Sequence, residues 1–83
     1  MDEILASRLD KLLIALEHIR THRPILTHKI GSRRTHLARF KWAMSCGYKP
    51  EYYNDKNLEK EIHRIEQDVV NWTREYLVAR KDV

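Results

Sequence analysis

A run of apolar residues near the end of the chain recurs at alternating spacings of four and three residues. The spacing is kept through three heptads, at Leu58, Ile62, Ile65, Val69, Trp72, Tyr76 and Ala79. Residues with this spacing share one face of a helix, so the run predicts a helix over residues 55–80, with Asp55 as its N-cap. A seam this regular needs another helix against it, either from the same chain or from a second copy.

Two further helices are predicted before this one. The first covers residues 2–21, where the same alternation joins Leu5, Leu9, Leu12, Leu16 and Ile19, and where Leu13 and Ile14 widen the apolar stripe. The second covers residues 24–46: Pro24 suits a first turn, and Gly47 suits a C-terminal cap. Gly31 weakens this second helix and Ser32 is able to start a new one, so the pattern leaves open a bend or division at Gly31-Ser32.

The chain is therefore expected to be all-α. It has only two Gly and two Pro among 83 residues, too few for the many turns of a β-sandwich or barrel. Short connections favour long antiparallel helices, arranged as a helical hairpin or a three-helix bundle. The length predicts one domain over residues 1–83. Because long helices around a small core often associate, we also expect a homo-oligomer.

Several classes of protein are disfavoured by length and composition. A chain of 83 residues has little room for a fold and a deep pocket, so we expect no enzyme and no cofactor. The single cysteine, Cys46, cannot form an internal disulfide, and this indicates a reducing compartment. Cys46 is expected to pack beside Gly47. No stretch is long and apolar enough for a membrane span, and the N-terminus does not resemble a signal peptide. The predicted location is the cytoplasm, with no membrane partner.

The charge of the chain is concentrated in one segment. Residues 18–50 contain no Asp or Glu and carry a charge of +8, whereas the rest of the chain carries −4. An ordinary solvated helix face intersperses acids among its bases, as the third helix does with Glu61, Arg64 and Asp68. The acid-free segment therefore predicts a surface that meets phosphates.

We predict from this segment a nucleic-acid-binding protein, with RNA slightly favoured over DNA. Aromatic residues among the bases are able to stack on unpaired nucleotides, although core packing of Trp42 explains that residue equally well. The predicted contact residues are Arg20, Arg23, Lys29, Arg33, Arg34, His36, Arg39, Lys41, Trp42, Tyr48 and Lys49. Tyr52 and Tyr53 either add to this surface or cover the end of the bundle.

One short run in this segment is similar to a known RNA-binding family. His18, His22 and then Ser32-Arg33-Arg34 follow the order of a motif in the fifteenth small-subunit ribosomal protein, a small helical RNA binder. The similarity is confined to residues 18–37 and implies RNA contact at those five residues. The chain departs from the family in lacking an acid shortly before the serine and in having an acidic third helix.

The same residues also allow two other interpretations. His18 and His22 lie one helical turn apart, a spacing able to hold a metal, but no acid or Cys motif accompanies them, and we predict no metal site. The alternative function is a small accessory or inhibitor protein that binds another protein through the basic middle helix. That partner could itself act on nucleic acid.

Overall fold

The computed structural model describes residues 2–47 and 51–81, with side chains described as far as residue 75. It contains α1 (Glu3–His22), a short 3₁₀ helix η1 (Pro24–Leu26), α2 (Thr27–Cys46) and α3 (Asp55–Lys81). The described residues contain no strand, which confirms the predicted all-α class. Among these helices, none is long and apolar enough to cross a membrane.

Local capping explains where α1 begins and ends. The backbone amide of Ile4 donates to the side chain of Asp2, with 2.7 Å between N and Oδ1, so Asp2 is the N-cap. At the other end the amide of Arg23 donates to the carbonyl of Ile19. Pro24 follows, and because proline disfavours helical geometry in the residue before it, α1 stops at His22.

The predicted second helix is divided, but at its start and not at Gly31-Ser32. Pro24 opens a single 3₁₀ turn, and α2 begins only at Thr27, whose hydroxyl donates to the carbonyl of Pro24. From there α2 runs without interruption through Gly31. A glycine weakens a helix interior by about 1 kcal/mol, which the packing of a 20-residue helix offsets. Gly47, with φ of 74°, ends α2 in the left-handed conformation that the sequence predicts.

Asn54, and not Asp55, caps the start of α3. The amide of Asn57 donates to the side-chain oxygen of Asn54, with 2.9 Å between N and Oδ1, and Asp55 is the first helical residue. The side-chain amide of Asn57 also donates to the carbonyl of Tyr52. These bonds tie the connecting loop to the first turn of α3.

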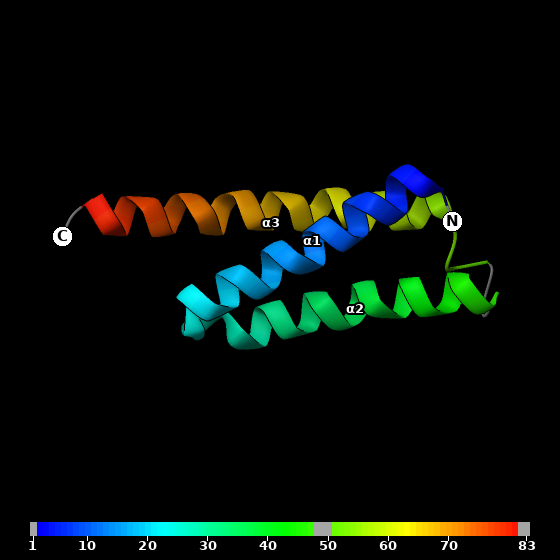
Figure 1. Ribbon diagram of the computed structural model, residues 1–83, viewed down its shortest axis with the longest axis horizontal. Helices are drawn as coiled ribbons and strands as arrows, with labels where there is room; N and C mark the ends of the chain where they lie inside the picture. The colour runs from blue at the N-terminus through cyan, green and yellow to red at the C-terminus, as the bar shows by residue number, and fades with distance from the viewer. Residues whose placement is uncertain (1, 48–50, 82–83) are drawn as a thin grey trace.

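The three helices enclose one apolar core. In Figure 1, α2 returns antiparallel to α1, and α3 runs in the same direction as α1, which crosses obliquely between the other two in this view. The largest fully buried side chains come from all three helices: Leu9, Leu16, Ile30, Leu37, Phe40, Leu58, Ile62 and Ile65. The core is narrow, since the molecule measures 49 × 21 × 16 Å.

The seam of α3 is filled within the chain. Leu58, Ile62 and Ile65 are fully buried in the same core cluster as the leucines of α1, Trp72 is buried, and Val69 packs against the cluster while half-buried. The side chain of Tyr76 lies outside the described residues. These α3 positions therefore need no second copy to cover them, and oligomerisation stays a prediction that must rest on other surfaces.

Candidate nucleic-acid interface

Two of the predicted contact residues of α2 form ion pairs with α1. The Arg34 guanidinium lies 2.7 Å from Glu17, measured from Nη1 to Oε2, and the Lys41 ammonium lies 3.0 Å from Asp10, measured from Nζ to Oδ1. All four side chains remain about half exposed. The acids that the middle segment lacks are therefore supplied on this side by the helix before it.

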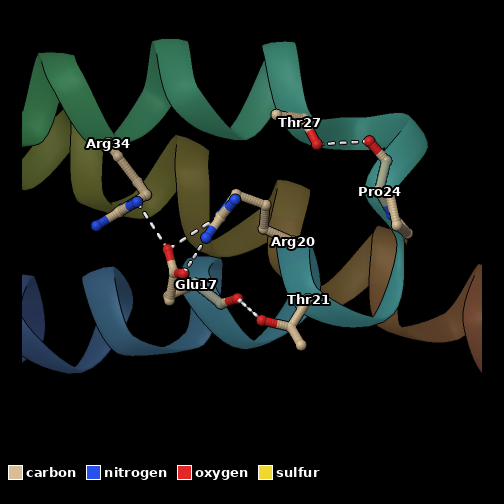
Figure 2. Close-up of polar contacts among 6 residues, drawn as sticks. All are labelled: Glu17, Arg20, Thr21, Pro24, Thr27 and Arg34. Atoms are coloured by element: carbon tan, nitrogen blue, oxygen red, sulfur yellow. Dashed lines mark hydrogen bonds and ion pairs between the residues drawn. The ribbon is translucent and has the colours of Figure 1, made fainter.

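Figure 2 shows how Glu17 joins two arginines, Arg20 of α1 and Arg34 of α2. Its carboxylate accepts from Arg20 on the same helix and pairs with Arg34 across the gap to α2. The hydrogen bond from Arg20, together with the positive charges of both arginines, lowers the pKa of the Glu17 carboxyl. The same bond raises the pKa of Arg20. Arg20 and Arg34 therefore share one carboxylate that holds α1 to α2.

The other side of α2 contacts carboxylates of α3. The Nε atom of Arg33 donates to Asp68, and the Nε2 atom of His36 lies 3.5 Å from Glu61. Glu61 also accepts from Arg64 on its own helix, with 2.8 Å between Oε2 and Nη2. Carboxylates of α3 thus reduce the positive charge on this flank of α2 as well.

Arg23 has a structural role in the turn after α1. Its Nη1 atom donates to the backbone carbonyl of Trp72 at 3.3 Å and to the carboxylate of Glu75 at 2.9 Å. Both partners belong to α3, so Arg23 ties the α1–α2 turn to the third helix. A phosphate contact would have to compete with these bonds.

The other described basic residues predicted to contact nucleic acid do not form such ion pairs. Lys29 and Arg39 are exposed, and the described part of the chain supplies no ion pair to either. Trp42 is 60% exposed, one turn after Arg39. Tyr48 and Lys49 lie outside the described residues. The tertiary structure thus divides the predicted contact residues into basic side chains that hold helices together and basic side chains that face solvent.

A polar groove lies along the outward face of α2. His28, Ser32, Thr35 and Arg39 follow one another at spacings of four, three and four residues, so they share one face of the helix. They line a groove of about 550 Å³, together with Thr27, Gly31, Arg33, His36 and Arg64 of α3. None of these nine described lining residues is acidic. The groove therefore presents hydroxyl, imidazole and guanidinium groups, which are the groups that contact phosphates.

Sequence reasoning missed part of this groove. Thr35 was not among the predicted contacts, although its helical spacing from His28 and Arg39 was a usable signal. Ser32 was predicted to contact RNA only through the similarity to a ribosomal protein. Arg64 had no such signal, because it reaches the groove from a different helix. His36 and Arg33 were predicted and do line it.

The other aromatic and metal-binding candidates take less part. Tyr52 and Tyr53 stack around Phe40, with ring centroids 5.7 and 5.0 Å from it, so they cover the end of the bundle. The rings of His18 and His22 are 4.4 Å apart, but the described residues contain no cluster of three potential metal ligands. Cys46 is exposed and not packed as the sequence suggested, because it precedes the cap on the solvent side of α2.

No family model, no curated protein and no solved structure matches this chain. The similarity of residues 18–37 to a ribosomal protein thus gains no support beyond its own few residues.

Proposed function

We propose that this chain is a cytoplasmic, non-enzymatic protein that binds nucleic acid, with RNA favoured over DNA, through the outward face of α2. One observation carries the proposal. The face from His28 to Arg39 lines an acid-free polar groove, whereas the acids that pair with α2 lie on its two flanks. A phosphate strand lying along this face meets hydroxyl, imidazole and guanidinium groups, with the carboxylates of Asp10, Glu17 and Asp68 to its two sides.

The ion pairs revise the roles of the predicted residues. Arg39, which lines the groove, is the primary phosphate contact in this proposal, and Lys29, exposed on α2 beside the groove, extends the positive surface. Arg33 adds to them, because it uses only its Nε atom on Asp68 and keeps its two Nη groups for a ligand. Arg20, Arg23, Arg34 and Lys41 act mainly as structural ion pairs.

The preference for a single strand over a duplex rests on Trp42 and on the size of the surface. From His28 to Trp42 the helix rises about 21 Å, which spans about six nucleotides at the 3.4 Å rise of a stacked strand. An exposed indole at one end is able to stack on an unpaired base, and base–aromatic stacking contributes about 1–3 kcal/mol per base. A base-paired duplex does not offer such a face.

The test is a binding titration of single-stranded RNA, single-stranded DNA and duplex DNA at two salt concentrations. With about three phosphate contacts, the logarithm of the affinity for a single strand should fall with the logarithm of salt at a slope of about −2. Arg39→Glu should abolish binding while circular dichroism stays helical. Lys11→Glu makes the same change of charge on the exposed surface of α1 and should leave binding intact. Absence of binding at low salt would remove the proposal.

Exposed isoleucines favour a second candidate, an accessory or inhibitor protein that binds another protein or a further copy of itself. Ile25 in the α1–α2 turn is 86% exposed, and Ile14 on α1 is 70% exposed. Apolar side chains at this exposure suit the centre of a protein interface better than a nucleic-acid surface. A partner recovered after nuclease treatment, and lost with Ile25→Ser, would support this candidate. Light scattering measures self-association directly.

A further inference from the structure

The groove on α2 has positively charged groups on two of its sides. Arg39 lines it from α2, and Arg64 lines it from α3. We propose that this groove is a binding site for a single phosphate group, held between Arg39 and Arg64. The inference rests on the proposed function and deepens it, because it names the chemical group bound and the place where it binds.

The two guanidinium groups are available to a ligand at little expense to the fold. Arg39 has no ion pair among the described residues. Arg64 is 59% exposed and pairs with Glu61 three residues earlier on the same helix, a kind of pair that contributes little to stability. If Arg64 turns to a phosphate, Glu61 still has the Nε2 atom of His36 at 3.5 Å. Arginine suits this role because its planar fork donates two parallel bonds to phosphate oxygens.

Two hydroxyl groups complete the set of donors. Ser32 and Thr35 are exposed on the same face of α2 as Arg39 and line the groove. Neither hydroxyl forms a hydrogen bond within the described residues, whereas the hydroxyl of Thr27 already donates to Pro24. Serine and threonine are common partners of phosphate oxygens. The groove therefore offers hydroxyl and guanidinium donors together.

Gly31 gives an independent observation that points to a ligand. A glycine in a helix interior is unfavourable, and α2 does not need one here: Gly31 has no positive φ, and a Cβ built on it would meet no atom within 4 Å. The missing side chain serves no packing contact in the chain. It leaves the wall of the groove open, which is the arrangement that lets a ligand approach the backbone closely.

The experiment is a titration of the full chain with inorganic phosphate, in which the backbone amide NMR signals are monitored. A titration with chloride at equal ionic strength is the reference. We expect saturable shifts at Gly31, Ser32, Thr35, Arg39 and Arg64. Arg39→Gln should weaken phosphate binding about tenfold, the change expected for losing a charge-assisted hydrogen bond, while Lys11→Gln should have no effect. Shifts that do not saturate, or an equal loss with Lys11→Gln, would show only diffuse ion association and overturn the proposal.

Substitution of Gly31 separates binding from stability. Gly31→Leu fills the groove while improving the helix, and it should lose phosphate binding with no loss of stability. Gly31→Ala is the matched control: it adds only a Cβ, so it should gain stability and keep more of the phosphate binding than Gly31→Leu does. Phosphate binding that survives Gly31→Leu unchanged would place the ligand elsewhere.

Two oligonucleotide probes identify the source of the phosphate. A short RNA with a 5′-phosphate and the same RNA with a 5′-hydroxyl are each tested for competition with inorganic phosphate. Competition by both indicates an internal diester, and competition only by the first indicates a terminal monoester; either supports the site. If RNA binds but phosphate does not, the inference fails and the proposed function stands. If phosphate saturates the groove but no nucleic acid binds, the proposed function fails and the phosphate site stands.

Discussion

The guanidinium of Arg33 in α2 donates to the carboxylate of Asp68 in α3, with 3.2 Å between Nε and Oδ2. Both side chains are less than a third exposed. The pair joins two segments of opposite charge, since Arg33 belongs to the acid-free segment and Asp68 to the acidic helix. Its effect is to hold α2 against α3 while reducing the charge that Arg33 presents to solvent.

Replacing Asp68 by Asn should therefore act oppositely on stability and on binding. The fold should lose about 1 kcal/mol or less, because a partly exposed ion pair contributes no more than that. Affinity for single-stranded RNA should rise about threefold, since Arg33 is released beside the groove. Urea denaturation and the RNA titration measure the two effects. Glu59→Gln removes the same charge from an exposed position on α3 and should not raise the affinity; equal gains in both variants would mean that only net charge matters.

Acid should weaken the contact between α1 and α2 through Glu17. Its hydrogen bond from Arg20 and the charges of Arg20 and Arg34 lower its pKa in the folded chain below the ordinary 4.5. A carboxyl with a depressed pKa contributes stability that is present above the ordinary value and is lost as the pH falls through the folded value. Glu17→Gln should therefore be less stable than the unmodified chain at pH 7, and the difference should shrink below about pH 4.5.

Thermal unfolding from pH 7 to pH 3 measures this difference. Glu51→Gln in the exposed loop is the control and should follow the pH profile of the unmodified chain. A stability difference for Glu17→Gln that stays constant over this range would contradict a role for the charge of Glu17.

The two glycines should respond to alanine in opposite directions. Gly31→Ala should stabilise the chain by about 1 kcal/mol, because the helix interior favours alanine and the new Cβ meets open space. Gly47→Ala should destabilise it by about 1 kcal/mol, because its φ of 74° is strained for an L side chain. Urea midpoints of the two variants give both signs. A loss of stability in Gly31→Ala would show that α2 needs its glycine for the fold.

Phe40 should be among the residues that the core tolerates losing least. It is fully buried, and its ring lies against His36, Tyr52 and Tyr53. Phe40→Ala should lower the free energy of unfolding by about 3–5 kcal/mol, a large share of the stability of a domain this small. Ile14→Ala, at a position 70% exposed, should change it by about 0.5 kcal/mol or less. Similar losses in both variants would contradict the described packing.

The helices and their buried faces were predictable because they depend on local spacing. All five residues at the four-three spacing of α1 are buried, and so are the first three members of the α3 seam, but Ile14, which was predicted to widen the α1 stripe, is 70% exposed. The errors at the helix boundaries were of one to three residues: Asn54 caps α3 instead of Asp55, and α2 begins at Thr27 instead of Pro24. In both places the chain had a competing local hydrogen bond, the side chain of Asn54 in one case and the 3₁₀ turn after Pro24 in the other.

The candidate site was predictable only as a segment. The sequence by itself determined that residues 18–50 would carry a surplus of positive charge, because composition does not depend on folding. Which of those charges face solvent was decided by tertiary structure alone. Their counter-ions, Asp10, Glu17, Glu61, Asp68 and Glu75, come from flanking helices and in most cases lie more than fifteen residues away. An ion pair at that separation forms only after the helices pack, so no spacing rule along the chain predicts it. Packing therefore decided that the neighbours of Lys29 and Arg39 are paired with carboxylates, whereas Lys29 and Arg39 are exposed.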